Sequence, residues 1–453
     1  MPAERLYYAD ATLTQFTATV TDIRERSRTG SASLWQIALD RSAFYPTSGG
    51  QPHDTGTLTA TAPSGARLEA PIVDVEEDEH GELWHLTAKP LLAGTGIEGR
   101  IDPARRIDHM QQHSGQHLLS ALFYRELHAP TVSFHLGDAV STIDLQIDAL
   151  APSALADIEQ LANTIVAEAR PVVLRTVSAA DAESLLADGT LRKLPPRAGD
   201  IRLIVISGGP AAGAIAGNSA ASATPDNQDP ASSADLDVNA CGGTHVASTS
   251  QIGAVLLRGT ERIRQSVRVS FLCGNRAIAA ARADDALLTQ LGRELSVGRA
   301  DLSPTLGRVK AEMRASAKER QALREDLANY HASRLLVEDP PHDDLRIVRR
   351  IFPDRDADYV KLLASRLISA APHTVALLAS TQQQTNAPAA VVIGCSQDLG
   401  RNAGEMLRAA LAPAGGRGGG SATLAQGLVP AENLAAALDA LESVLRAKPV
   451  PAV

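Results

Sequence analysis

The sequence contains few aromatic residues and few cysteines. Phe, Trp and Tyr make up 3% of the 453 residues, so a core must be built from Leu, Val, Ile and Ala. The three cysteines, Cys241, Cys273 and Cys395, are odd in number and widely spaced, which argues against a disulfide framework. No run of about 18 apolar residues occurs, and the N-terminus lacks the apolar segment of a signal peptide. We therefore expect a soluble cytoplasmic protein.

The sequence also has fewer positively charged than negatively charged residues, 43 Lys and Arg against 52 Asp and Glu. The formal net charge is -9, whereas nucleic-acid-binding proteins are usually basic. Any contact with phosphates would therefore depend on local patches and would weaken with salt. Two stretches, RGTERIRQSVR and LRKLPPR, could supply them through Arg258, Arg262, Arg264, Arg268, Arg192, Lys193 and Arg197. For any single one of these residues, an ordinary solvated side chain is the simpler interpretation.

The hydrophobic patterns predict an α+β protein of several domains. Short alternating segments over residues 1–105 predict a small β-barrel domain, and residues 106–274 mix helix and strand in an α/β domain. Residues 275–340 are rich in Ala, Arg and Glu and predict a helical arm. Residues 341–453 alternate strand and helix, which predicts a C-terminal α/β domain.

Several local features can be predicted more closely. Asp108 is a plausible N-cap for a helix over 108–128, and Pro304 is expected to break the arm into two helices. The stretch 208–237 holds no Lys or Arg and consists mostly of small and polar residues, so we expect a disordered insertion. Cys273 and Cys395 have no evident ligand partners and are expected to be packing residues.

Four residues suggest a metal site. In DHMQQHSGQHLLS, His113 and His117 are four apart and share one helix face, although such a pair alone is more often a polar surface. In NACGGTHVAS, Cys241 and His245 are also four apart, with glycines that permit a tight turn between them. Together they form a mixed nitrogen and sulfur set that suits tetrahedral Zn²⁺. His109 lies one turn too early and is expected to be a neighbour.

These motifs resemble those of a known family. HSGQHLLS and CGGTH look like the HxxxH and CxxxH motifs of the alanyl-tRNA synthetase editing domain, most closely in the freestanding AlaX-type editing proteins. AFYPTSGGQPHDTGTL resembles the FYP-x-x-GGQ-x-x-D-x-G segment of that family, and ERIRQSVRVSFLCGNRA resembles the segment that follows CxxxH. GGRGGGSATLAQG, which includes Arg417, is similar to the glycine-rich signature of the DHH-associated domain. The order of the segments also matches, as in the long form of the family.

The resemblance implies a function. A chain that starts directly at the barrel, without an aminoacylation core, looks like a trans-acting editor. It would be a zinc-dependent deacylase of mischarged alanine tRNA, acting on seryl- or glycyl-tRNA. The expected partners are that tRNA and a second copy bound through the C-terminal region, with no membrane. Resemblance to a synthetase also implies nucleotide and ATP binding.

The expected reaction is hydrolysis of an aminoacyl ester by an activated water, which zinc can assist. Four protein ligands make a closed site, whereas catalytic zinc usually keeps one position open. Either one ligand is loose, or the ion adds a fifth ligand, or zinc mainly positions the substrate. Our hypothesis is that His113, His117 and Cys241 are permanent ligands and His245 is exchangeable.

Three further residues are candidates for catalysis or specificity: Gln116, Thr47 and Gln51. Gln116 lies inside HSGQH and faces either the pocket edge or the surface. In PTSGGQ, the polar side chains serve either turn chemistry or, as the family implies, discrimination of serine from alanine. We expect Thr47→Val to lower serine discrimination and to retain zinc. His135 is either a contact in the site or a strand histidine in the core.

Two other functional classes fit the same residues. One is a noncatalytic tRNA-binding module whose zinc only stabilises the fold. The other is a zinc hydrolase that acts on a different ester.

Overall fold

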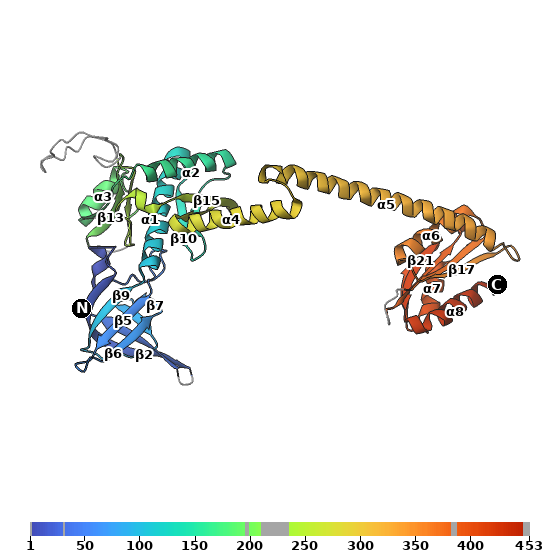
Figure 1. The fold of residues 1–453 in the computed structure, drawn as a ribbon, viewed down its shortest axis with the longest axis horizontal. Coiled ribbons are helices and arrows are strands. Elements are labelled where there is room, and N and C mark those ends of the chain that lie inside the picture. The colour runs from blue at the N-terminus through green and yellow to red at the C-terminus, as the bar shows by residue number, and fades with distance from the viewer. Residues whose placement is uncertain (1, 30–31, 195–198, 210–234, 382–386, 447–453) are drawn as a thin grey trace. The chain divides into compact units, whose positions relative to one another are not determined.

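The structure is a computed structural model that describes residues 2–29, 32–194, 199–209, 235–381 and 387–446. The chain divides into two compact units, Met1–Gln290 and Leu291–Val453. The first unit holds a large curved sheet and a mixed helix and strand region, and the second holds one sheet with helices (Figure 1). The predicted insertion lies mostly outside the described residues, but its last residue, Asp237, is buried in a strand (Asp237–Ala240), so the expectation of disorder was wrong for that residue. Of the helices described, none combines the length and apolar composition needed to span a lipid bilayer.

The N-terminal part of the first unit is a seven-stranded sheet with the order β6-β5-β9-β2-β3-β8-β7. Its strands are β2 (Gln15–Thr29), β3 (Ala32–Leu39), β5 (Gly56–Thr61), β6 (Arg67–Ile72), β7 (Asp74–Glu77), β8 (Leu83–Thr87) and β9 (Gly96–Ile101). Strand β2 pairs with β9 along its first part and with β3 along its second part, and this double pairing curves the sheet. Before it lie β1 (Glu4–Arg5), which pairs with β4 (Arg41–Ser42), and the short helix η1 (Leu6–Tyr8).

The predicted closed barrel is not found among the described strands. The hydrogen-bonded order has two edges, β6 and β7, which are consecutive in the chain and separated by Val73. The N–H of Val73 donates to the carbonyl of Leu86 in β8, so the sheet curls until β6 approaches β8. The alternating strands were predicted correctly, but the sheet is interrupted at this residue.

The rest of the first unit surrounds helix α1 (Pro103–Leu127) with two antiparallel sheets. The first has the order β10-β11-β16-β15, and the second has the order β12-β13-β14. The elements are β10 (Thr131–Leu136), β11 (Ser141–Leu145), α2 (Pro152–Ala167), β12 (Val172–Val177), α3 (Ala179–Ala187), β13 (Ile201–Ile206), β14 (Asp237–Ala240), η2 (Thr249–Ile252), β15 (Val255–Ile263) and β16 (Ser266–Cys273). Leu118, Leu122 and Phe123 of α1 pack in one core with Ile143 and Val269 of the first sheet.

Helix α1 begins earlier than the sequence suggested. Asp102, not Asp108, is the N-cap, and its carboxylate accepts from the N–H groups of Ala104 and Arg105 at 2.9 and 3.3 Å. Pro103 occupies the first helical position, where its missing N–H costs nothing. Asp108 lies inside the helix and forms an ion pair with Arg276.

A buried ion pair fixes α1 against the loop that precedes β5. Arg106 and Asp54 are 1% and 0% exposed, and the guanidinium Nη2 lies 2.6 Å from the carboxylate. The other donors of Arg106 reach the carbonyls of Ala11 and Ala43, and Asp54 also accepts from the N–H of Tyr45. Because every charged group has partners, this pair sets the position of α1 relative to the loop.

Two helices follow, as predicted: α4 (Gly274–Leu295) and α5 (Leu302–Glu338), with the short η3 (Arg299–Asp301) between them. Pro304 does not separate them, because it lies in the first turn of α5, where proline is tolerated. The chain instead leaves α4 at Ser296, which has a φ of +54°. The prediction of two helices was right and the position of the break was wrong.

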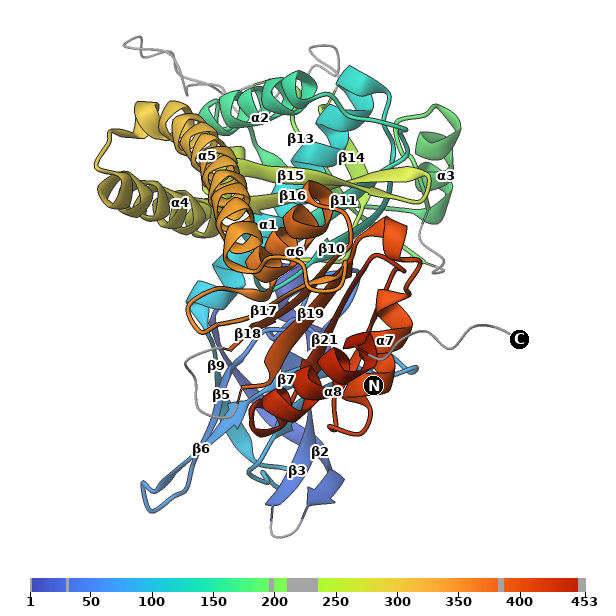
Figure 2. The same ribbon diagram turned by 90° about the vertical axis from the view of Figure 1, so that its right-hand side faces the viewer.

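The second unit contains a five-stranded sheet with the order β17-β18-β19-β21-β20. Its elements are β17 (Arg346–Phe352), α6 (Ala357–Ala370), β18 (Thr374–Ser380), β19 (Ala389–Cys395), η4 (Gln397–Leu399), α7 (Ala403–Leu411), β20 (Arg417–Gly420), β21 (Leu424–Val429), η5 (Ala431–Asn433) and α8 (Leu434–Arg446). Val375, Leu377 and Ala379 of β18 pack with α7 and α8, whereas Ala376 and Leu378 pack with α5 and α6. Helices thus cover both faces of the sheet (Figure 2), which confirms the predicted α/β arrangement of these elements.

Candidate metal centre and adjoining cavity

The four predicted ligand residues meet at one point. His113 and His117 come from α1, and Cys241 and His245 come from the turn after β14; their ligand atoms all lie within 4.8 Å of one another. The Cys241 Sγ is 3.4 Å from His113 Nε2 and 3.3 Å from His245 Nε2. A tetrahedral zinc ion with bonds of about 2.0–2.3 Å separates its ligand atoms by roughly 3.5 Å. The donor set and its spacing therefore fit a single metal ion of this kind.

Each of the three histidines is held through its Nδ1 atom. The Nδ1 partners are Gln51 Oε1 at 2.8 Å for His113, Asp237 Oδ2 at 3.3 Å for His117, and Ser114 Oγ at 3.2 Å for His245. This arrangement leaves the Nε2 atom of every ring for a metal. Partners of this type fix the tautomer and orientation of ligand histidines and raise their basicity.

The charge states favour metal binding. Burial alone would raise the pKa of Cys241, but His113 and His245 and hydrogen bonds from the ligand histidines hold the pKa well below its usual value. Burial and the neighbouring His113 lower the pKa of His245 to about 3, so this imidazole is neutral. Burial opposes the charged form of His117, yet its bond to Asp237 raises its pKa. A thiolate is thus available without strong base, as a metal ligand requires.

Two glycines allow the ligand elements to approach closely. A Cβ at Gly243 would lie 2.2 Å from His113 Cε1, and a Cβ at Gly115 would lie 2.2 Å from Cys273 Sγ. Neither Gly242 nor Gly243 has a positive φ, so the backbone of the turn does not itself require glycine at these positions. The need is for space: the CGG segment lies directly on the His113 ring.

Gln51 is a positioning residue for this centre. Its Oε1 accepts from His113 Nδ1 and from the N–H of Thr244, and its Nε2 donates to Thr244 Oγ1 at 2.8 Å. Gln51 is fully buried, so these contacts engage both ends of its amide. The PTSGGQ loop therefore positions His113, one candidate ligand, and also the turn that carries two others, Cys241 and His245.

Thr47 is not brought to the cluster. Its hydroxyl lies 3.0 Å from His53 Nδ1 and accepts from the His53 N–H, and the residue is exposed. It lines a different cavity from Cys241, whereas Ser48 lines the cavity that includes Cys241. The expected role of Thr47 in serine discrimination stays a prediction.

Gln116 and His135 differ from their simplest interpretations, whereas His109 does not. Gln116 is buried, not at the surface, and its Nε2 donates to Ser120 Oγ while its Oε1 has no partner among the described residues. His135 lies on β10 and is exposed, so it is not a core histidine. His109 is 2% exposed and lies outside the cluster, as expected. Cys273 and Cys395 are fully buried packing residues, which confirms that prediction.

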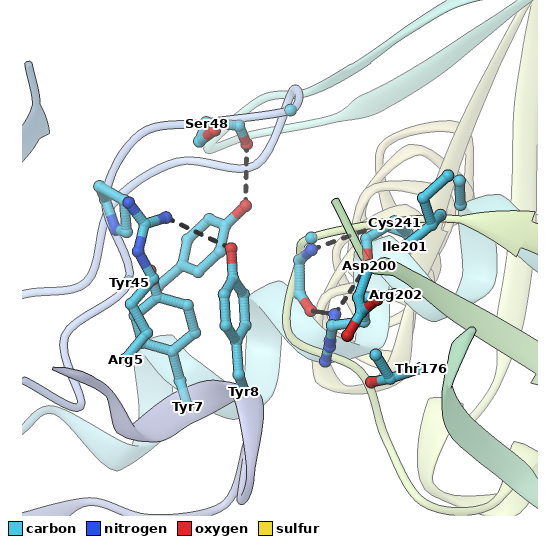
Figure 3. Close-up of a pocket in the computed structure, with 15 residues that line it drawn as sticks. Arg5, Tyr7, Tyr8, Tyr45, Ser48, Thr176, Asp200, Ile201, Arg202 and Cys241 are labelled. Atoms are coloured by element: carbon cyan, nitrogen blue, oxygen red, sulfur yellow. Dashed lines mark hydrogen bonds between the residues drawn. The ribbon is translucent and has the colours of Figure 1, made fainter. Parts of the chain in front are cut away.

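A cavity of 510 Å³ adjoins the cluster on the side of Cys241. Figure 3 shows Tyr7, Tyr8 and Tyr45 on one side of it and Arg202 and Cys241 on the other. The guanidinium Nη1 of Arg202 donates to the carbonyls of Cys241 and Gly243 at 2.9 and 2.8 Å. Arg202 thereby holds the backbone of the turn that carries Cys241 and His245, while its side chain lines the cavity.

Sequence reasoning missed several residues that support the site. Ser114 and Thr244 stand inside the motifs HSGQH and CGGTH, so their positions offered a signal. Asp237, Tyr8 and Arg202 stand in no motif and are brought to the site by the fold alone. Asp237 also pairs with Arg192 and accepts from the amide of Asn239, which fixes its carboxylate beside His117.

The predicted basic patches are partly neutralised. Arg258 pairs with Asp284, and Arg268 pairs with Asp144 at 2.7 Å. Arg192 is the partner of Asp237, and Arg197 lies outside the described residues. Arg417 is exposed on β20, an edge strand of the five-stranded sheet in the second unit.

Comparisons with known proteins show which proteins this chain is similar to. A family model described as the threonyl and alanyl tRNA synthetase second additional domain matches residues 230–268, and the DHHA1 domain model matches residues 346–447. The alanine–tRNA ligase of Methanosarcina acetivorans is 28% identical over 436 residues, which is 94% of this chain and 42% of the relative. That of Natronomonas pharaonis is 29% identical over 450 residues, which is 98% of this chain and 44% of the relative.

The chain thus spans less than half the length of these curated relatives. In the crystal structure of the C-Ala domain from Aquifex aeolicus alanyl-tRNA synthetase, 98% of that chain matches 24% of this one at 26% identity and a TM-score of 0.22. The chain is a distant relative of the alanine–tRNA ligases over most of its length, with an editing-like second additional domain and a DHHA1 domain. The expected ATP binding finds no support in the two matched domains.

Proposed function

We propose that His113, His117, Cys241 and His245 bind Zn²⁺ and that the chain hydrolyses the aminoacyl ester of mischarged alanine tRNA, with a seryl or glycyl group. The observation that carries this proposal is the cluster itself, in which three imidazoles are fixed at Nδ1 and a thiolate completes the set. The similarity to alanine–tRNA ligases over 94% of the chain or more supports the choice of substrate.

Other residues of the chain would orient the metal ligands. Gln51, Asp237 and Ser114 orient the ligand rings, so the site needs little rearrangement as the substrate arrives. When bound, Zn²⁺ would supply a lowered pKa for a water molecule or polarise the ester carbonyl. Cys241 is the least buried of the four ligands and lines the 510 Å³ cavity, so the ester would approach from its side.

Binding of tRNA is part of the proposal. It is supported by the similarity of the chain to alanine–tRNA ligases and by the match to the DHHA1 domain. Because several arginines of the expected patches are already paired, exposed residues such as Arg417 are the better candidates for phosphate contacts. The homodimer through the C-terminal region stays a prediction.

A second candidate is a noncatalytic tRNA-binding module with a structural zinc. One observation favours it: the cluster offers four protein ligands, three of them buried, and such closed sets are typical of structural zinc. In that case the metal would hold α1 and the CGGTH turn together. The cavity beside Cys241 would then have no part in hydrolysis.

A deacylation assay separates the two. Seryl-, glycyl- and alanyl-tRNA(Ala) are each incubated with the zinc-loaded chain, with the chelated chain and with no protein. The proposal expects rapid loss of the seryl or glycyl group, little loss of the alanyl group, and no activity after chelation. Turnover of none of the three would favour the binding module. Turnover of simple esters without dependence on tRNA would point to a different hydrolase.

A further inference from the structure

The carboxylate of Asp237 is buried beside the cluster and contacts three side chains. Its Oδ2 lies 3.3 Å from His117 Nδ1 and accepts from Asn239 Nδ2, and its Oδ1 pairs with Arg192 Nη2. The side chain of Asp237 is only 3% exposed. A carboxylate this deeply buried is costly unless a charged partner accompanies it. Arg192 supplies that charge.

The guanidinium of Arg192 is in turn held against an aromatic ring. Its Cζ lies 5.4 Å from the centroid of the Tyr124 ring, a position in which a guanidinium is attracted to the face of the ring. Tyr124 is 45% exposed and follows His117 on α1 by seven residues, which is about two helical turns. The four side chains therefore form a continuous series, from Tyr124 at the surface through Arg192 and Asp237 to His117 in the cluster.

The backbone that carries the middle of this series is anchored in one hydrophobic cluster. Leu191, next to Arg192, is 1% exposed and packs with Val238, next to Asp237. Asp237 also opens β14, where it pairs with Ile206 of β13. Because both segments are already ordered by this packing, the pairing of Arg192 with Asp237 costs little further conformational freedom.

The pair differs from an ordinary ion pair of the surface. Arg175 and Asp235 form such a pair nearby, 3.9 Å apart and with side chains that are 58% and 33% exposed. Pairs of that kind contribute little to a fold because water screens both charges. In contrast, Arg192 pairs with a buried carboxylate that itself contacts a candidate metal ligand.

Asp237 also has room to turn away from His117. A cavity of 360 Å³ is lined by Tyr124, Arg192 and Asp237. If the pairing with Arg192 were lost, the buried carboxylate would gain by turning toward water in this cavity. The ring of His117 would then lose the partner at its Nδ1.

We propose that Tyr124 and Arg192 are positioning residues that act through Asp237 and fix His117 with its Nε2 toward the metal. This inference rests on the part of the proposed function that assigns Zn²⁺ to the cluster. A partner at Nδ1 sets the tautomer and the orientation of a ligand histidine, and thereby its affinity for a metal. A tyrosine at the surface, which does not belong to the cluster, thus controls how tightly a buried site holds its ion.

The zinc affinity of the full chain, measured by competition with a chromophoric chelator, tests the role of Arg192. We expect Asp237→Asn to weaken zinc binding about 10–100-fold and Arg192→Gln about tenfold, as for other partners of ligand histidines. Arg192→Lys keeps the charge and should recover part of the loss. Arg175→Gln is the matched control, because it removes an arginine that pairs with the exposed Asp235, and it should bind zinc like the wild type.

Tyr124 is tested in the same assay. Tyr124→Leu should weaken zinc binding severalfold, because Arg192 loses the ring that holds its guanidinium. Tyr124→Phe keeps the ring and should bind zinc like the wild type, as should Tyr330→Leu, the control at an exposed site on α5. A merely structural role would instead lower the melting temperature of the zinc-free chain, which we expect to stay unchanged in Tyr124→Leu.

A double variant separates an effect through Asp237 from a general effect. A residue that acts only through another has no further influence once that other residue has been replaced. Arg192→Gln in the Asp237→Asn background should therefore bind zinc as weakly as Asp237→Asn alone. Losses that add up in the double variant would show that Arg192 acts by some other route.

The outcomes distinguish this inference from the proposed function. If Arg192→Gln or Tyr124→Leu binds zinc as tightly as the wild type, or if the losses add up in the double variant, the positioning role is overturned, even where the chain deacylates tRNA. If both variants lose affinity and the double variant shows no further loss, the role stands, even where no ester is hydrolysed. A wild-type chain that binds no zinc overturns both proposals.

Discussion

His113 Nδ1 lies 2.8 Å from Gln51 Oε1, although the two residues are 62 positions apart in the chain. One belongs to helix α1 and the other to the loop that precedes β5. The same loop carries Asp54, whose buried carboxylate pairs with Arg106 of α1. The two contacts, two helical turns apart on α1, fix the helix to the loop and thereby fix the direction of His113, a proposed metal ligand.

Gln51→Leu should therefore weaken zinc binding about 10–100-fold, because His113 loses the partner that fixes its ring. The measurement is a competition titration with a chromophoric chelator. Gln36→Leu is the matched control: Gln36 is also buried, but its amide bonds Glu76 and Arg24 away from the cluster. Equal zinc affinity in the two variants would show that the contact to His113 is incidental.

Gly243→Ala should abolish stoichiometric zinc binding at neutral pH. The new methyl group would lie 2.2 Å from His113 Cε1 and 2.9 Å from Gln51 Oε1, so a ligand ring or the turn must move. Gly242→Ala is the control, since its nearest neighbour is the Tyr8 hydroxyl at 3.6 Å. Metal content by atomic emission distinguishes them, and a zinc-bound Gly243→Ala protein with a normal melting temperature would contradict the close approach.

His245→Ala should retain more zinc than Cys241→Ala if His245 is the exchangeable ligand. The thiolate provides the strongest donor of the set, and three ligands with an open position suffice for catalytic zinc. Zinc content after dialysis against a weak chelator is the measurement. Equal loss in the two variants would instead make all four side chains permanent ligands, in keeping with the hydrogen bond from His245 to Ser114.

The N-terminal sheet should lose stability as the pH falls from about 6.5 to 4. Burial lowers the pKa of His85 to about 4, against the hydrogen bond to the Ile37 carbonyl. The folded sheet keeps this imidazole neutral, whereas the unfolded chain takes up a proton below about 6.5. The stability from this residue is therefore complete above that pH and is lost on acidification, by about 2–3 kcal/mol at pH 4.5.

Urea unfolding followed by tryptophan fluorescence checks this prediction, because both tryptophans, Trp35 and Trp84, lie in that sheet. His85→Gln should flatten the fall in stability between pH 7 and 4.5. His80→Gln, at an exposed site, should leave the profile unchanged. A wild-type profile in His85→Gln would mean that other groups cause the loss.

The sequence predicted most strands and helices because their periodicity is strong and local. It also predicted which four side chains gather at the candidate metal centre, since the HxxxH and CxxxH spacings keep the two members of each pair close together. The start of α1 was predicted too late because Asp108 is also a residue that commonly caps helices, whereas Asp102 and Pro103 carry the capping geometry. The barrel was expected because short strands do not reveal a break such as that at Val73.

The partners of the ligands could not be predicted in the same way. Asp237 and Arg202 reach the centre through β14 and β13, whose pairing joins residues far apart in the chain. The spacing of the motif predicted only that Gly243 permits a turn, because spacing reports local conformation. In the structure the constraint on Gly243 is its contact with the ring of His113, which is distant in the sequence. Such constraints exist only in three dimensions.

The most direct test of the central claim is a zinc titration of deacylation. The chelator-stripped chain is supplied with increasing Zn²⁺, and the rate of loss of the seryl group from seryl-tRNA(Ala) is measured at each step, beside the Cys241→Ser variant. We expect no activity without metal, a rise that saturates at about one ion per chain, and no recovery in the variant. Full activity in the stripped chain, or equal activity in Cys241→Ser, would contradict the claim.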